Sequence, residues 1–354
     1  MKAKRQNDPG KKKTARIVVG SIFGVFALFV LTVVMITVIG NKALIKRAKS
    51  YDPAVIENQL VPEKDENGYW TFTTDRDLKV MQLTDIHIGG GWLSLKQDAQ
   101  ALNAVATMIQ AEKPDLVVVT GDMAFPVFFK AGTFNNLLSA REFAALMERL
   151  GVYWTVAFGN HDSEIYSYYS REKVADFYGS PEFKYCLFQK GPDDVDGYGN
   201  QIINVKNSKG LLTQSIYIFD SHSYTDGDYF GIMWKYDNIH DNQIEWYRDN
   251  VNLMNKQNNA RLKELGMPED SDVKSIAFLH IPLPEQRTAW YEYMANGFKD
   301  TENVKYVYGK AGEGKKIIYC GQRQDNLFKT IQELGSTKGI FYGHDHDNNF
   351  SIYY

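Results

Sequence analysis

The stretch Lys79-Val-Met-Gln-Leu-Thr-Asp-Ile-His-Ile-Gly89 contains an apolar run that leads to Asp85 and His87. The glycines at positions 89, 90 and 91 then break the run. Side chains two residues apart on a strand point to the same side, so both can converge on one point where the strand ends. The stretch therefore predicts a β-strand at Lys79–Leu83 whose carboxyl end presents two metal-ligand side chains.

Four later apolar runs end in the same way. Each motif alone is weak, because a Gly-Asp after a strand is usually a turn and a histidine at a strand end is usually structural. The recurrence is more specific, since five of the seven histidines fall either in the first stretch, as His87 does, or in these four later motifs. The motifs are Gly121-Asp122, Gly159-Asn-His-Asp162, His280 and Gly343-His-Asp-His346.

The segments between these motifs show the period of amphipathic helices. Helices are expected from Ser94, as an N-cap, to about Glu112 and at about Phe134–Leu150. They alternate with strands to give a βαβαβ series, which predicts a parallel sheet that binds its ligands at the carboxyl ends of the strands. A long helix is expected at about Asn242–Leu265. The other strands are expected at Leu116–Val119, Val152–Ala157, Gln201–Val205, Ser215–Phe219, Ser275–Leu279 and Gly339–Tyr342.

The residue types indicate which metals would bind. Asp and Asn oxygens with imidazole nitrogens suit Mn, Fe or Zn, whereas a thiolate site would need more cysteines than Cys186 and Cys320. Those two either pair in an oxidising compartment or remain free thiols. One carboxylate can bridge two ions, and ions about 3.5–4 Å apart can clamp a phosphoryl group. The ligand types therefore favour two metal ions.

In this order the motifs resemble the calcineurin-like metallophosphoesterase superfamily over roughly residues 75–350, and most of all its single-domain branch related to purple acid phosphatases. The resemblance implies an α/β fold, a four-layer αββα sandwich of two mixed sheets between helices. It implies hydrolysis of phosphate mono- or diesters by a metal-bridging hydroxide. His161 would contact the phosphate or protonate the leaving group. One ion would be held by Asp85, His87, Asp122 and His346, and the other by Asp122 as the bridge, Asn160, His280 and His344.

The chain also departs from that branch. His87 stands where purple enzymes have Gly, and Phe125 where they have a Tyr ligand, so no tyrosinate-to-iron colour is expected. The second Asp that orients the catalytic His in the family is absent, which makes Asp162 the candidate substitute. Only eight residues follow His346, so the end of the domain is expected to be truncated or to have a short last edge.

Three further features allow two interpretations each. His222 lines the cleft or is structural, and His240 is a surface residue or caps the following helix. The aromatic residues between Glu285 and Gly321 form a substrate wall or simply pack a surface insertion.

The N-terminus differs in character from the rest. Residues 1–16 form a basic arm with seven Lys/Arg and one Asp, although the whole chain has a net charge of −3. The remainder is therefore acidic, which excludes a nucleic-acid-binding body. Ile17–Ile39 is a run of 23 residues without charge, long enough to cross a bilayer core of about 30 Å. A cleaved signal peptide, with an apolar region of about 7–15 residues, and a buried core helix are the alternatives.

Charge also predicts topology. The seven cations before the run outnumber the four after it, which predicts a cytoplasmic N-terminus and places residues 40–354 outside the cell membrane. Residues 40–68 are expected to be a stalk and residues 69–354 the metallophosphoesterase domain.

The expected function is that of a membrane-anchored dinuclear phosphoesterase. One alternative is a phosphodiesterase acting on nucleotides or on lipid or cell-wall head groups. The other is a non-catalytic, membrane-tethered metal-binding protein. The sequence does not determine the oligomeric state.

Overall fold

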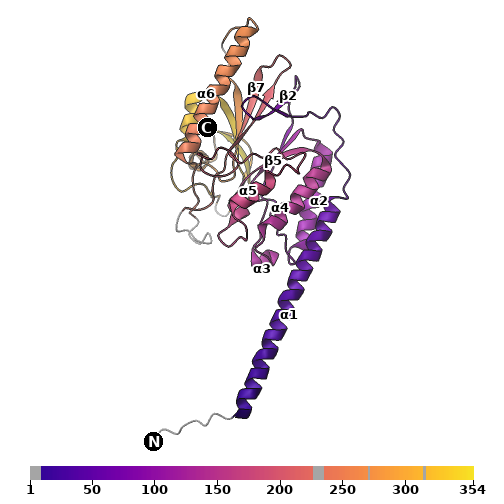
Figure 1. The fold of residues 1–354 in the computed structure, drawn as a ribbon. Helices are drawn as coiled ribbons and strands as arrows, with labels where there is room; N and C mark the ends of the chain where they lie inside the picture. The colour runs from indigo at the N-terminus through magenta and orange to yellow at the C-terminus, as the bar shows by residue number, and fades with distance from the viewer. Residues whose placement is uncertain (1–8, 226–234, 270–271, 314–315) are drawn as a thin grey trace.

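The computed structural model describes residues 9–225, 235–269, 272–313 and 316–354 (Figure 1). Residues 1–8 of the expected basic arm lie outside this description. The strands are β1 Glu63–Lys64, β2 Trp70–Thr73, β3 Val80–Leu83, β4 Leu116–Thr120, β5 Tyr153–Ala157, β6 Gln201–Lys206, β7 Leu212–Ile218, β8 Lys274–Phe278, β9 Lys305–Ala311, β10 Thr337–Phe341 and β11 Asn348–Tyr353. The helices are α1 Pro9–Ala48, α2 Leu95–Glu112, α3 Phe128–Ala131, α4 Asn136–Leu150, the 3-10 helix η1 His161–Ser163, α5 Arg171–Tyr178, α6 Asp241–Glu264, α7 Pro284–Ala295 and α8 Leu327–Leu334.

The smaller of the two large sheets confirms the predicted βαβαβ series. Its order is β3-β4-β5, both pairings are parallel, and α2 and α4 are the crossovers. Every residue of β4 and β5 is buried, as wholly apolar strands covered on both faces require.

The larger sheet has the order β1-β2-β6-β7-β8-β10. It is mixed, because β1–β2 and β6–β7 are antiparallel while β2–β6, β7–β8 and β8–β10 are parallel. The expectation of two mixed sheets is therefore correct for this sheet and wrong for β3-β4-β5, which is parallel throughout.

Three hydrophobic clusters define the layers. Leu116 and Val118 of β4 pack with Ile203 of β6, Ile216 of β7 and other apolar residues between the two sheets. A second cluster joins β4 and β5 to α2, α4 and α5, and a third joins β7 and β8 to α6 and α8. Helices thus cover the outer faces of two sheets that pack against each other.

Helix α2 starts where it was expected, whereas α4 and α6 start one or two residues from the expected positions. Ser94 occupies the N-cap position of α2, but its side chain makes no capping bond. Its hydroxyl donates instead to Asp98, at 2.7 Å, and accepts the N–H of Gly91 at 3.2 Å. Helix α4 begins after Asn135, whose side chain accepts the N–H of Leu137.

The aromatic segment 285–321 contains α7 and β9, and β9 pairs with β11 in a two-stranded sheet. Trp290 and Tyr293 of α7 are buried in a cluster with Val304 and Ile318. Tyr293 also stacks on Tyr306 at 5.2 Å. These contacts favour the packing interpretation over a substrate wall.

The two cysteines are free thiols, Cys320 buried and Cys186 partly exposed. Burial raises the pKa of Cys320 to about 11, so this thiol is un-ionised at neutral pH.

Helix α1 runs well beyond the uncharged segment and ends against the domain (Figure 1). Leu44 and Ala48 on its last turns are buried in the cluster that contains α2 and α4. It is long and apolar enough to cross a membrane by length and composition, a test that a signal sequence also passes.

Residues 40–68, which were expected to be a stalk between membrane and domain, make contacts with the domain. Ala54 N–H donates to Leu150 O at 2.9 Å, and the Gln59 side chain donates to Gly151 O at 2.6 Å. Glu63 and Lys64 form β1, which pairs with β2. This segment therefore lies along the domain, where apolar contacts and backbone hydrogen bonds hold it.

Candidate metal centre

The carboxyl ends of five strands meet at one edge where the two sheets come together. The N–H of Asp85, after β3, donates to Gly121 O at 3.1 Å, and that of His87 donates to Asp122 O at 3.0 Å. The N–H of His344, after β10, donates to the Asp85 carboxylate at 3.0 Å. His280 Nδ1 lies 2.8 Å from Thr120 O. Backbone geometry thus gathers motifs that lie up to 259 residues apart.

One group of side chains at this edge comprises Asp85, His87, Asp122 and His346, with ligand atoms all within 4.8 Å of one another. His346 Nε2 is 3.3 Å from Asp85 Oδ1, and His87 Nε2 is 3.5 Å from Asp122 Oδ2. Four nitrogen and oxygen donors this close together could hold one metal ion.

A second group comprises Asp122, His280 and His344. His280 Nε2 lies 3.2 Å from Asp122 Oδ2, 3.3 Å from His344 Nδ1 and 3.1 Å from Asn160 Oδ1. Asp122 belongs to both groups, which is the position that a bridging carboxylate needs.

Three buried polar atoms of the first group have no hydrogen-bond partner among the residues that the structure describes: Asp85 Oδ1, His87 Nε2 and Asp122 Oδ2. Leaving such atoms unpaired costs free energy, so native proteins almost always satisfy them. Their convergence on one space, with donor types suited to Mn, Fe or Zn, fits a metal ion.

Four of these residues adopt left-handed backbone conformations that side chains other than Gly rarely take. The φ angles are 51° at Asp85, 54° at His87, 48° at Asp122 and 76° at His344. Such strain costs on the order of 1–3 kcal/mol per residue and persists where the surrounding structure imposes it. It turns these side chains toward one another at the ends of their strands.

Two motif glycines are required by close approach. A Cβ at Gly121, where φ is +85°, would lie 2.5 Å from His280 Nδ1. A Cβ at Gly159 would lie 2.2 Å from Asp122 Oδ1. Glycine therefore makes room for the side chains of the site.

The electrostatics couple the buried groups. Burial alone would raise the pKa of Asp122, but the charges of His280 and His161 hold that pKa well below its ordinary value. Burial would likewise lower the pKa of His280, yet Asp122 raises it to about 9. Burial and the neighbouring His280 lower the pKa of His344 to about 3. The site thus favours an ionised Asp122 and a neutral His344.

His161 lies beside the two groups. Its Nε2 is 4.0 Å from Asp122 Oδ2, and its Nδ1 is 2.6 Å from Glu164 Oε1. Burial works against protonation, but Asp122 and Glu164 raise the pKa of His161. Glu164 was not among the expected site residues, and only its spacing of three residues from His161 hints at it.

Asp162 has a different position from the one expected. Its carboxylate accepts the N–H groups of Asp122 at 3.0 Å, Ala124 at 2.8 Å and Gly159 at 2.8 Å. Burial raises its pKa to about 6. The expectation that Asp162 orients His161 is therefore wrong, since the carboxylate on His161 Nδ1 is that of Glu164.

Arg171 and Tyr224 support the site without having been expected. The Arg171 guanidinium pairs with the buried Asp220 and donates to Gly159 O at 2.7 Å. The Tyr224 hydroxyl donates to Glu164 at 3.1 Å and accepts the Asn160 amide N–H at 3.0 Å. Arg171 and Tyr224 both lie outside the five motifs, so the sequence pattern does not indicate that they contact the site.

Phe125 lies beside His87 of the first group. Its ring stacks on His87 with centroids 4.7 Å apart and an interplanar angle of 15°. Because it has no hydroxyl, Phe125 cannot be a metal ligand, and only the face of its ring contacts His87.

His222 and His240 stack on each other with centroids 4.0 Å apart. His222 Nε2 is 2.8 Å from Gln243 Oε1, while His240 precedes α6 and pairs with Asp196 at 2.7 Å. With Asp237 they form a third group able to hold an ion, although these hydrogen bonds already engage its nitrogens. The structural interpretation of His222 fits these contacts, and His240 occupies the N-cap position of α6, as its capping interpretation expects.

The sequence profile described as calcineurin-like phosphoesterase matches residues 78–348, well over half of the chain. The chain belongs to this family. The resemblance predicted from the five motifs is thereby confirmed, and with it an α/β metallophosphoesterase fold.

This calcineurin-like phosphoesterase is similar to plant and yeast proteins. "Probable inactive purple acid phosphatase 14" of Arabidopsis thaliana is 29% identical over 300 residues, 79% of this chain and 68% of that protein. "Phosphatase DCR2" of Saccharomyces cerevisiae is 29% identical over 300 residues, 79% of this chain and 46% of that protein. A dimetal phosphatase from Danio rerio, at 11% identity, superposes with a TM-score of 0.46 over 76% of this chain and 82% of that one.

Proposed function

We propose that this chain is a dinuclear metal-dependent phosphoester hydrolase. The observation that carries the proposal is the sharing of buried Asp122 between two groups of metal-ligand side chains. Membership of a phosphoesterase family and the unpaired buried atoms at the same point support it.

The ligands follow from the two groups. One ion would be held by Asp85, His87, Asp122 and His346, and the other by Asp122, Asn160, His280 and His344. Bound there, Mn, Fe or Zn ions would lower the pKa of a water molecule and neutralise charge on a phosphoryl group. Because Phe125 cannot ligate, iron at this site would lack a tyrosinate band.

His161 is the candidate general acid. The hydrogen bond from Nδ1–H to Glu164 fixes the ring and leaves Nε2 facing Asp122. Nε2 can therefore contact the phosphoryl group and hold the proton that the leaving oxygen needs. Glu164 positions the ring and favours its protonated form.

A membrane anchor is part of the proposal. Most of the uncharged run Ile17–Ile39 is exposed along α1, and a basic flank precedes it. We propose that it spans the cell membrane with the N-terminus in the cytoplasm and the domain outside. Protease added to intact cells should remove the domain, and complete protection would contradict this topology.

A non-catalytic metal-binding protein is the second candidate, favoured by relatives whose names include "probable inactive". The purified full chain, dialysed with Mn, should bind two ions by elemental analysis. It should also hydrolyse p-nitrophenyl phosphate or its bis-ester. Two bound ions without turnover of either ester would favour the non-catalytic candidate, and no bound metal would contradict both.

A further inference from the structure

We infer that the metal-centre edge of the domain lies against the bilayer and that the substrate is the phosphoester of a membrane lipid. The inference rests on the proposed membrane anchor and phosphoesterase activity. It adds a surface, the rim patch, formed by Leu93, Phe128, Phe129, Phe134 and Tyr168.

The direction of α1 relative to α2 shows which edge faces the membrane. Gly40 lies against Leu95 at the start of α2, while Tyr51 bonds to Asn103 and Asp52 O accepts from Gln110 further along. Residues 40–52 therefore run alongside α2 in the same direction. Since α2 returns from the carboxyl end of β3, its start and the membrane side of α1 both lie at the metal-centre edge.

No spacer separates the apolar run from the domain. The run ends at Ile39, and a Cβ at Gly40 would lie 2.5 Å from the Leu95 side chain. A run of 23 residues is only slightly longer than a bilayer core of about 30 Å at about 1.5 Å per residue. The domain edge is thus held at the membrane surface and cannot move far from it.

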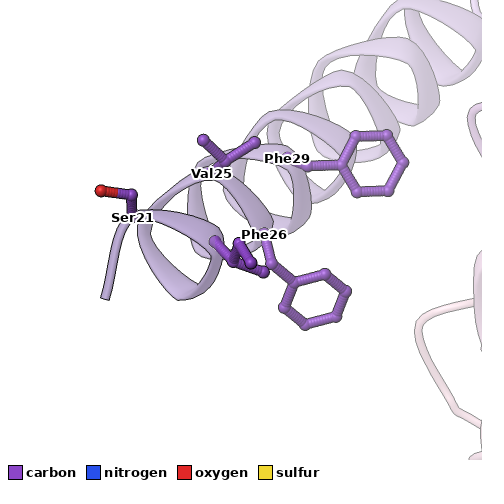
Figure 2. A pocket seen from close by; sticks show the side chains of 5 residues that line it. Ser21, Val25, Phe26 and Phe29 are labelled. Atoms are coloured by element: carbon purple, nitrogen blue, oxygen red, sulfur yellow. The ribbon is translucent and has the colours of Figure 1, made fainter. Parts of the chain in front are cut away.

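The apolar run itself is free to contact lipid. Val25, Phe26 and Phe29 project from α1, and Figure 2 shows them around a shallow pocket on the helix. Their exposed fractions are 70%, 62% and 56%.

The rim patch lies where α1 leaves the domain. Leu93 N–H donates to Ala131 O of α3 at 3.1 Å, which joins α3 to the start of α2. Figure 1 shows α3 on the side of the domain from which α1 extends. Phe129 on α3 is 88% exposed, and Phe128 stacks on Phe134 at 5.4 Å.

Exposed aromatic side chains of this kind are typical of membrane interfaces. Tyr168, 73% exposed, joins the patch through its N–H bond to Phe134 O. Between Phe125 and Asn136 the sequence carries a single charge, the cation Lys130. An apolar loop with one cation and no acid matches an acyl region beneath anionic head groups.

The same loop connects the rim patch to the metal centre. Lys130 Nζ lies 5.0 Å above the Phe125 ring, and that ring stacks on His87. A phosphate presented at the membrane surface therefore meets Lys130 and the metal centre on one face. A lipid phosphoester can contact the rim patch and the metal centre at the same time, whereas a soluble ester contacts only the metal centre.

The location of the patch is tested with full chains carrying Phe129→Cys or, as a matched control, Val55→Cys. Val55 is 71% exposed and follows Ala54, which bonds Leu150 at the opposite end of α4. Each is labelled with an environment-sensitive fluorophore and reconstituted in phosphatidylcholine vesicles, with the labelled parent chain as background. A blue shift and quenching by spin-labelled lipid at 129 but not at 55 is expected. No shift at 129 overturns the inference.

The substrate is tested separately with Phe129→Ser against Val55→Ser. Vesicles contain dioleoyl phosphatidic acid or phosphatidylglycerol, and p-nitrophenyl phosphate is the soluble comparison. Phe129→Ser should lower lipid hydrolysis about ten-fold, with turnover of the soluble ester unchanged. Equal rates of the two variants on lipid, or hydrolysis of the soluble ester only, overturns the lipid substrate. Inactivity on every ester with the blue shift intact contradicts the proposed function and leaves the membrane-facing patch in place.

Discussion

His161 Nδ1 lies 2.6 Å from Glu164 Oε1, three residues further along the chain. The pair spans η1, which follows β5 and places Glu164 behind the imidazole. Glu164 is buried, and one of its oxygens also accepts from Tyr224, so the ring of His161 is held in one orientation.

Replacing Glu164 by Gln should lower kcat while the two metal ions remain bound. The loss is expected to be about 10–100-fold, because the general-acid contribution is about 100–10,000-fold and a neutral amide would orient the ring less well. Steady-state kinetics and elemental analysis check this. Glu245→Gln, an exposed carboxylate on α6, is the control. An unchanged kcat would remove Glu164 from the proposed mechanism.

Metal stoichiometry should distinguish the two groups of ligands. Asp122→Ala removes the shared carboxylate, so both ions are expected to be lost. His346→Ala removes a half-exposed member of the first group only, so one ion should remain. Elemental analysis after dialysis measures both variants. Equal metal content in the two would contradict the bridging position of Asp122.

Asp162→Asn should affect stability more than chemistry. The carboxylate accepts three backbone N–H groups, and hydrogen bonds to a charged group contribute about 1.5–3 kcal/mol each. An amide retains one acceptor, so a loss of about 2 kcal/mol or more in unfolding free energy is expected. Thermal unfolding measures this loss of stability. An unchanged Tm together with a large fall in kcat would instead indicate that Asp162 has a catalytic role.

Glu142 should make stability depend on pH. Burial and the neighbouring Asp98 raise its pKa to about 9 from an ordinary 4.5. Between those values the folded state binds the extra proton, so stability is greatest below about pH 4.5 and falls as pH rises to about 9. The slope should approach about 1.4 kcal/mol per pH unit.

Glu142→Gln should flatten that dependence, since an amide can still accept the 2.6 Å hydrogen bond from Asn41 of α1 but does not titrate. Thermal unfolding of wild type and variant tests the change. The measurement runs from pH 6 to about pH 9, which is the pKa of Glu142 in the folded state. Parallel curves for wild type and variant would show that Glu142 is ionised in the folded protein.

Much of the site could be predicted from sequence. The carboxyl ends of parallel strands lie at the same edge of a sheet. Apolar strands that end in Asp, Asn or His therefore place those residues at that edge, independently of the conformation of the loops. Asp85, His87, Asp122, His280, His344 and His346 were found in this way, and the structure brings them together.

Only the tertiary structure decided which carboxylate forms a hydrogen bond with which partner. Asp162 is adjacent to His161 in sequence, yet the turn after β5 directs its carboxylate to backbone N–H groups and leaves Glu164 facing the ring. The contact of α1 with α2 and α4, and hence the edge that faces the membrane side, depends on packing between distant segments. The sequence by itself determined the ligand types, the strands that carry them and the apolar run, since each is a local pattern. The orientation of α1 and the hydrogen-bond partners of the carboxylates required the whole fold, because both depend on which distant segments pack together.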